Sequence, residues 1–232
     1  MYLTPQNKLD ADFDWELYFN DSNEIENLDA KEIFLSARNI LKENKIFMTF
    51  SASKLLRNIL KKADIPDNPA ILELGAASGF LSRWLVSSYS GHAVLVDKGE
   101  NSYKKFLAHG KENQNLEYIQ SDLFDLPSKL DAKFDIVCSF GLIEHFENKK
   151  ELLEMHHMFL KESGYILILV PEDTYLTRVY YELHPELNRG YRELLSKNDL
   201  KNIMIENGYN VLELGSSSEY VYDFAGILCQ LK

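Results

Sequence analysis

The amino-acid sequence predicts an α/β fold: a mostly parallel sheet of seven strands, with helices on both faces and an antiparallel last strand. Short apolar runs alternate with stretches of helical periodicity from residue 70 onward, and the last two runs follow one another across a polar turn. Hydrophobic residues make up 45% of the 232 residues and charged residues 26%, the usage of an ordinary globular chain. Disorder, fibrous repeats and disulfide scaffolds are therefore disfavoured.

The central and C-terminal parts of the chain supply these elements in order. Strands are expected at residues 70–74, 93–96, 116–119, 134–140 and 165–170, with helices between them at 80–87, 102–109 and 150–160. Strand, helix and strand in succession require crossover connections, which produce a parallel sheet. A later helix at 197–207 precedes strands at 209–214 and 224–231, which can pair as a hairpin across the polar segment GSSSE.

The N-terminal residues predict a helical cap. Apolar residues recur at helical spacing over 29–43, where Asp29 and Glu32 fit a capping box, and again from Ser51 to the breaker Pro66. We therefore expect a cap over residues 1–67 and a core over 68–232, which together form one structural domain.

Charge, cysteine usage and hydropathy limit the partners and the compartment. The chain has 25 basic and 36 acidic residues, a net charge of -11, which repels a phosphate backbone and disfavours a nucleic-acid partner. Cys138 and Cys229 lie in apolar runs without metal-ligand spacing, so we expect buried thiols in a reducing compartment. No stretch resembles a signal peptide or approaches the roughly 20 apolar residues of a membrane span. We expect a cytoplasmic protein without a membrane partner and leave its oligomeric state open.

A glycine-containing loop follows the first strand of the sheet. In the run from Glu73 to Phe80, Gly75 and Gly79 permit a tight turn and a close approach of the backbone to a ligand. A dinucleotide-binding loop would have glycine in place of Ala77 and Phe80, so hydride-transfer cofactors are disfavoured. A turn that serves packing alone remains the alternative.

Acidic residues follow the second and third strands, at the edge where an open parallel sheet binds ligands. Asp97 can accept hydrogen bonds from two ribose hydroxyls, and Asp122 with the backbone N–H of Leu123 can hold an adenine edge. Each acid alone is typical of a helix cap or a solvated turn. Together with the glycine loop they indicate a nucleoside pocket.

At this point the chain resembles a known family. The runs ILELGAASGF, VLVDK, QSDLFDLP and FDIVCSFGLIEHF resemble successive motifs of class I S-adenosylmethionine-dependent methyltransferases, which have a Rossmann-like fold. The resemblance covers about residues 69 to 232, and the late helix and strand resemble small-molecule members such as the ubiquinone-pathway O-methyltransferases. The family usually has a third glycine where Ala77 stands, and we expect a negative φ there, which alanine tolerates.

The resemblance implies S-adenosyl-L-methionine as the cofactor and a set of residues that bind it. Glu73 would order the loop and the methionine amino group, Asp97 would hold the ribose, and Asp122 with Leu123 would hold the adenine. Aromatic residues near the N-terminus, including Phe13 and Phe19, could face the sulfonium cation or could anchor the cap. The other cofactor-binding residues expected are Gly75, Ala76, Gly79, Lys98, Ser139, Phe140, Trp15 and Tyr18.

Catalysis needs little machinery, because a sulfonium methyl group is already activated and has mainly to be aligned. His145, beside Glu144, is the candidate base for removing a proton from the acceptor, although family members carry a similar pair without that duty. The Asn/Asp-Pro-Pro loop typical of nucleobase and glutamine methylation is absent after the fourth strand. No carboxylate directly follows that strand either, so we expect no metal.

The segment from 172 to 196 concentrates aromatic and basic side chains in an acidic chain. It is expected to form a lid whose arginines hold a carboxylate of a small acceptor. The alternative is an amphipathic connector whose arginines pair with Glu182, Glu186 and Glu193. The substrate-binding candidates are Tyr175, Arg178, Tyr181, His184, Arg189, Tyr191 and Arg192.

These observations predict methyl transfer to oxygen or nitrogen of a small-molecule metabolite. A methyltransferase-fold subunit that binds the cofactor without transferring a methyl group is one alternative. A protein methyltransferase, which would need an open groove, is the other.

Overall fold

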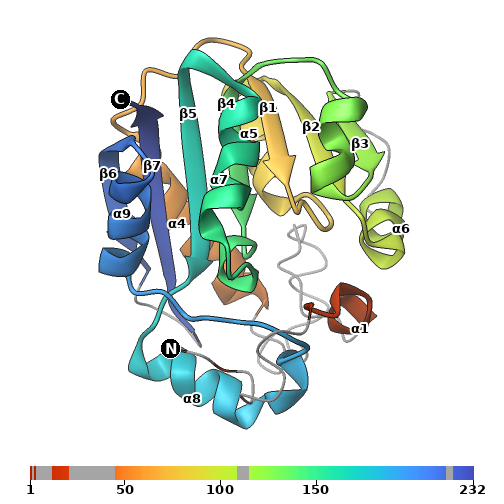
Figure 1. The fold of residues 1–232 in the computed structure, drawn as a ribbon, viewed down its shortest axis with the longest axis vertical. Helices are drawn as coiled ribbons and strands as arrows, with labels where there is room; N and C mark the ends of the chain where they lie inside the picture. Colours follow the sequence, from red (N-terminus) through yellow and green to blue (C-terminus); the bar gives the residue numbers. More distant parts are fainter. Residues whose placement is uncertain (2, 4–11, 21–44, 109–114, 218–221) are drawn as a thin grey trace.

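The computed structural model describes residues 1, 3, 12–20, 45–108, 115–217 and 222–232. One sheet of seven strands in the order β3-β2-β1-β4-β5-β7-β6 runs through it (Figure 1). Neighbours among β1 to β5 are parallel, and β7 is antiparallel to both β5 and β6. The predicted fold class is confirmed. The strands are β1 Ala70–Leu74, β2 His92–Asp97, β3 Leu116–Gln120, β4 Phe134–Phe140, β5 Leu160–Pro171, β6 Tyr209–Ser216 and β7 Phe224–Leu231.

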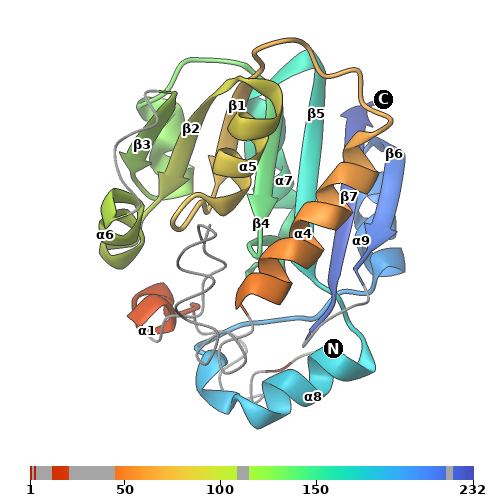
Figure 2. The ribbon, with the colours of Figure 1, turned by 180° about the vertical axis from the view of Figure 1, so that it is seen from behind.

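Helices cover both faces of the sheet, as predicted. On one face lie α4 Lys45–Leu60, α5 Phe80–Tyr89 and α6 Glu100–Ala108. This face is turned toward the viewer in Figure 2. On the other face lie α7 Lys149–Met158 and α9 Lys197–Glu206. Each amphipathic helix buries its apolar side against a sheet that is itself apolar on both faces, which is typical of parallel sheets.

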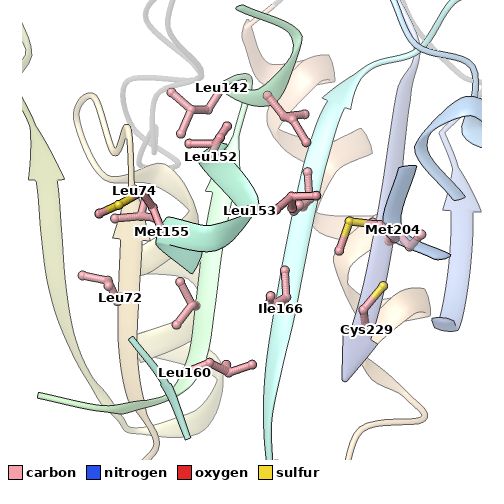
Figure 3. Packing of buried hydrophobic residues seen from close by; sticks show 14 of the residues in the cluster. Leu72, Leu74, Leu142, Leu152, Leu153, Met155, Leu160, Ile166, Met204 and Cys229 are labelled. Atoms are coloured by element: carbon pink, nitrogen blue, oxygen red, sulfur yellow. The ribbon is translucent and has the colours of Figure 1, made fainter. Parts of the chain in front are cut away.

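The core between the sheet and α7 with α9 is continuous (Figure 3). Leu72 and Ile166 from the strands meet Leu152 and Leu153 from α7 and Met204 from α9, all with 1% exposure or less. Cys229 belongs to the same cluster, and Cys138 to the cluster on the opposite face. Both cysteines are free and buried, which confirms that part of the prediction.

The boundaries of two elements differ from the prediction. The helix expected from Ser51 begins at Lys45, and β5 begins at Leu160, where the sequence pattern predicts the end of a helix. Two contacts extend β5 through a polar stretch whose own residues predict a turn. The N–H of Phe134 donates to the carbonyl of Phe159, and Lys161 forms an ion pair with Asp135. The helix expected at 29–43 lies outside the described residues.

Helix α4 packs directly on the sheet. A Cβ at Gly215 would lie 2.8 Å from Leu55, and one at Gly226 would lie 2.5 Å from Ile59. Glycine on β6 and β7 therefore creates the space that lets α4 approach. This helix belongs to the core layers, and the division into a cap and a core at residue 67 stays a prediction.

The chain reverses its direction of sheet growth at β1. Strands β2 and β3 extend the sheet to one side of β1, and β4 begins its extension to the other. Ligands of open α/β sheets bind beyond the carboxyl ends of strands at such a point. The short helix α1 Trp15–Asn20 and the helix α8 Tyr175–Leu183 both lie at this end of the molecule (Figure 1).

Candidate functional site

Gly75 and Gly79 shape the loop between β1 and α5. Their φ angles are +66° and +87°, values that glycine adopts without strain. A Cβ at Gly75 would lie 2.7 Å from Cδ1 of Leu142, and one at Gly79 would overlap the side chain of Leu95. Packing on both sides of the loop therefore depends on glycine at both positions.

Glu73 connects the end of β1 to the start of α5. Its side chain is buried, and Oε2 accepts a hydrogen bond of 2.8 Å from the backbone N–H of Ser82. Burial raises the pKa of Glu73 to about 7, and hydrogen bonds from Ser82 oppose this shift. The carboxyl group thus ties the loop to the first turn of α5. Its contact with the methionine amino group stays a prediction.

Ala77 differs from the expectation. Its φ is +48°, so the expected negative φ is wrong. The N–H of Ala77 donates to Oδ2 of Asp97 at 2.9 Å, and its carbonyl accepts from the hydroxyl of Tyr118 at 3.1 Å. These two hydrogen bonds hold alanine in a left-handed conformation that costs a residue with a Cβ about 1 to 2 kcal/mol.

Asp97 ends β2 and holds two loops. Oδ1 accepts a hydrogen bond from the N–H of Gly99 at 2.8 Å, and Oδ2 accepts the one from Ala77. Burial raises the pKa of Asp97, and these backbone hydrogen bonds oppose the shift. Because a carboxylate offers about four lone-pair positions, acceptor capacity remains for hydroxyl groups of a ligand.

Asp122 begins the short 3-10 helix Leu123–Ser128. Its Oδ1 accepts a hydrogen bond from the N–H of Phe124 at 3.0 Å, and its Oδ2 lies 3.6 Å from Nζ of Lys98. The helix-cap interpretation is therefore correct for Asp122. The same residue also lines a cavity, so capping and ligand binding are compatible.

Two cavities lie side by side at this end of the sheet. The larger has a volume of about 390 Å³ and is lined by Asp97, Lys98, Asp122 and Leu123 from the loops after β2 and β3. The smaller has a volume of about 90 Å³. Three residues, Trp15, Gly75 and His145, line both cavities and join them into one site. The smaller cavity is also lined by Glu73, Ala76, Phe140, Glu144, Tyr181, Arg192, Tyr222 and Phe224.

The N-terminal residues pair with the segment that follows α8. The N–H of Asp14 donates to the carbonyl of Arg189 at 2.8 Å, and the N–H of Leu194 donates to the carbonyl of Met1 at 2.7 Å. A Cβ at Gly190 would overlap the backbone of Asp12. This pairing sets Trp15 and Tyr18 of α1 against the cavities, and their contact with a cofactor stays a prediction.

His145 lies in the short 3-10 helix Ile143–His145 after β4. Its ring lies 3.9 Å from the ring of Phe13 and 4.6 Å from that of Trp15, measured between centroids. Nδ1 lies 3.0 Å from the carbonyl of Tyr191 and can only donate to it, so the other nitrogen, Nε2, carries the lone pair of the neutral ring. Burial and the charge of Arg192 lower the pKa of His145 well below its usual value.

Glu144 lies beside His145 and faces the smaller cavity. Its Oε1 lies 3.7 Å from Nε2 of His145, and its Oε2 is buried without a hydrogen-bond partner in the described part of the chain. Burial raises the pKa of Glu144 to about 7, while the charge of Arg192 opposes this shift. The carboxyl group of Glu144 is therefore a titratable group at the wall of the smaller cavity.

The structure brings three of the predicted lid residues to the site. Tyr181 and Arg192 line the smaller cavity, and Tyr191 lines the larger one. Arg192 is 1% exposed, and its guanidinium carbon lies 4.5 Å from the ring centroid of Tyr181 and 5.0 Å from that of Phe13.

The other lid candidates do not line either cavity. Tyr175 is 80% exposed, and Arg178 forms two hydrogen bonds of 2.6 and 2.8 Å with Asp173 on the surface. His184 pairs with Glu186 at 3.0 Å. The side chain of Arg189 is also absent from both linings. For Arg178 the connector interpretation fits, although its partner is Asp173.

Among the cofactor candidates, Ser139 and Gly79 lie beneath the site. Ser139 is fully buried, and its Oγ lies 3.1 Å from Nε2 of His156 in α7. Phe140, the next residue on β4, does line the smaller cavity. Alternation of side chains along the strand explains why only one of these neighbours reaches it.

Sequence reasoning missed several lining residues. Glu144 was named beside His145 but not as a site residue. Phe13 was named as a residue that could face the sulfonium cation or anchor the cap, but it was not among the cofactor-binding residues expected. Phe224 begins β7 and Tyr222 shortly precedes it, far along the chain from the motifs, and the antiparallel pairing of β7 with β5 brings this end of the strand to the cavity. No local motif marks these two positions.

Neither a metal site nor a membrane-spanning helix is found in the part of the chain that the structure describes. No group of three or more His, Cys, Asp or Glu side chains is placed there to hold a metal ion. Within the same residues, no helix is both long and apolar enough to cross a membrane. The absence of a metal from the reaction stays a prediction.

Curated relatives resemble about three fifths of this chain. A mitochondrial ubiquinone biosynthesis O-methyltransferase of Dictyostelium discoideum is 21% identical over 162 residues, which cover 62% of this chain and 50% of the relative. The ubiquinone/menaquinone biosynthesis C-methyltransferase UbiE of Blochmanniella pennsylvanica is 31% identical over 171 residues, covering 62% of this chain and 66% of the relative. The chain thus spans about half to two thirds of the length of these relatives.

A solved structure has the same fold. The magnesium protoporphyrin IX methyltransferase of Synechocystis PCC 6803, crystallised with bound SAH, has a TM-score of 0.65 at 12% identity and matches over 93% of both chains. The family model for the methyltransferase domain matches residues 47–214, which include the glycine loop, both acidic turns and the lid segment. This chain therefore belongs, through its methyltransferase domain, to the family of class I S-adenosylmethionine-dependent methyltransferases.

Proposed function

We propose that this protein transfers the methyl group of S-adenosylmethionine to an oxygen or nitrogen atom of a small-molecule acceptor. The observation that carries this proposal is the pair of cavities joined by Trp15, Gly75 and His145. The larger offers carboxylates suited to a nucleoside, and the smaller offers buried groups suited to an acceptor. The two curated relatives named above are enzymes of ubiquinone or menaquinone biosynthesis. Their acceptors are not assigned to this chain.

The residues of the larger cavity fit the adenosine part of the cofactor. Asp97 has acceptor capacity left for ribose hydroxyls, and Asp122 with Leu123 lies where an adenine edge would bind. Gly75 lies between the cavities and has no side chain to obstruct a ligand that extends from one to the other. When bound, S-adenosylmethionine supplies a methyl group on a positively charged sulfur, which needs alignment with the acceptor and exclusion of water.

Glu144 is better suited than His145 to take a proton from the acceptor. A general base works best when its pKa is close to the working pH, and burial raises the pKa of Glu144 to about 7. Its unpartnered Oε2 is available for a hydrogen bond from an acceptor hydroxyl or ammonium group. His145, whose pKa is lowered, would then cover the junction of the cavities.

The small volume of the acceptor cavity favours a small molecule over a protein side chain. At about 90 Å³, the cavity would enclose a compact reacting group, and α1 with the lid segment covers it. An open groove, which a protein acceptor needs, would require these segments to separate. The strongly acidic net charge of -11 likewise disfavours a nucleic-acid acceptor.

The test separates an enzyme from a cofactor-binding subunit. Purified protein is first titrated with S-adenosylhomocysteine by calorimetry, and is then incubated with isotopically labelled S-adenosylmethionine and a panel of small hydroxy and amino compounds. Binding together with labelled product supports the proposal. Binding without transfer to any compound would support the subunit interpretation, and absence of binding would contradict both.

A further inference from the structure

Arg192 is a buried cation in the wall of the smaller cavity. It belongs to the segment between the 3-10 helix Pro185–Leu187 and α9, and its side chain is among the largest that are fully buried. Its guanidinium group lies against the rings of Tyr181, Phe13 and Tyr18, with centroid distances of 4.5, 5.0 and 5.5 Å. These rings come from two separate parts of the chain, the N-terminal segment and α8, so packing from both segments sets the position of Arg192.

Two of the three nitrogen atoms of this guanidinium group lack a hydrogen-bond partner in the described part of the chain. Neither Nε nor Nη1 has a partner among the described residues, although both atoms are buried. Glu144 lines the same cavity but does not form an ion pair with Arg192 within 4.0 Å, and its own Oε2 is unpartnered. Arg178, by contrast, is an arginine of the same lid whose donors form two hydrogen bonds to Asp173.

An unpaired buried cation is costly, because burial removes its hydration. The aromatic faces around Arg192 offset part of this cost but accept no hydrogen bond in the plane of the guanidinium group. The missing partner is therefore an acceptor of hydrogen bonds that carries negative charge. Arginine pairs best with carboxylate and phosphate-like groups, whose oxygens match its planar donors.

We propose that the methyl acceptor carries an anionic oxygen group, a carboxylate or a phosphonate-like oxyanion, which binds Arg192 inside the smaller cavity. This inference rests on the proposed function and adds the chemical class of the acceptor. With the anion at Arg192, the rest of the acceptor lies in the cavity that Glu144 and His145 also line. One charged group at the wall would thus both select the acceptor and direct its reacting atom toward Glu144.

The same carboxylate chemistry has a second source, the methionine carboxylate of the cofactor. Glu73 and Ala76, which are expected near the methionine, line the same cavity as Arg192. The experiment therefore measures cofactor and acceptor separately. Arg192→Met keeps an elongated apolar side chain among the rings, Arg192→Lys keeps the positive charge, and Arg57→Met on the exposed face of α4 is the matched control.

The probes are benzoate, its neutral isostere benzamide, acetate and methylphosphonate, each titrated into protein saturated with S-adenosylhomocysteine. We expect at least one anion to bind the wild type, and benzoate to bind at least tenfold more tightly than benzamide. Arg192→Met should weaken anion binding tenfold or more, Arg192→Lys should restore part of it, and Arg57→Met should leave it unchanged. Affinity for S-adenosylhomocysteine should change by less than threefold in all variants.

Three results would overturn the inference. One is the failure of all three anions to bind the loaded wild type at millimolar concentration. Another is equal binding of benzoate to wild type and Arg192→Met. The third is a tenfold loss of S-adenosylhomocysteine affinity in Arg192→Met with anion binding intact, which would assign Arg192 to the cofactor carboxylate. The proposed function fails separately, if the wild type binds no cofactor or methylates neither acidic nor neutral compounds.

Discussion

Replacement of Ala77 by glycine should stabilise the protein, which is the opposite of the usual effect of adding glycine. Ala77 has a φ of +48°, and a residue with a Cβ pays about 1 to 2 kcal/mol in the left-handed region. Glycine removes that cost. It also gives the unfolded chain more conformational freedom, which lowers the stability of the folded state by about 0.4 to 1 kcal/mol and opposes the benefit. The expected net gain is about 0.5 to 1 kcal/mol.

The two hydrogen bonds of Ala77 involve its backbone and are kept in the variant. A chain of this size shifts its Tm by about 2 to 4 °C per kcal/mol, so we expect a rise of about 1 to 4 °C in a thermal melt. Ala76→Gly is the matched control, because Ala76 is the adjacent alanine and does not have a positive φ. Glycine there should destabilise by about 0.5 to 1 kcal/mol.

The melts of both variants are measured with and without S-adenosylhomocysteine, since the loop lies at the cofactor site. A fall in the Tm of Ala77→Gly as large as that of Ala76→Gly would refute the reasoning. It would mean that the left-handed conformation of Ala77 carries no strain, or that the loop has another conformation in solution.

Three further predictions concern the site. Asp97→Ala should weaken S-adenosylhomocysteine binding by roughly 1.5 to 3 kcal/mol in calorimetry, the scale of hydrogen bonds to a charged group, and unchanged affinity would contradict the ribose assignment. Because the raised pKa of Glu144 is about 7, kcat should increase as the pH rises through about 7 and the carboxylate forms. Glu144→Gln should abolish that dependence, and a profile that persists in the variant would exclude Glu144 as the base. Arg178→Ala should leave acceptor kinetics unchanged and have little effect on stability, because its pairing with Asp173 is on the surface; a tenfold rise in acceptor KM would contradict this.

Local patterns in the sequence were sufficient for the fold class and for the cofactor half of the site. Apolar runs and helical periodicity depend on neighbouring residues, so β1, β4 and β7 begin and end where they were predicted. Gly75, Asp97 and Asp122 lie at or just after the carboxyl ends of β1, β2 and β3, and parallel strands bring these ends to one edge. Their convergence on the larger cavity could therefore be predicted, although their assignment to parts of the cofactor stays a prediction.

The acceptor half of the site was decided by tertiary structure. Arg178 and Arg192 are alike in the sequence, but one pairs with Asp173 on the surface and the other is buried among rings from two distant segments. Likewise, Ala77 has a positive φ because Asp97 and Tyr118 bind its backbone across the sheet edge. The sequence alone determined which residues follow the strands. Burial and unsatisfied hydrogen bonds depend on which distant segments meet, and only the folded chain determines that.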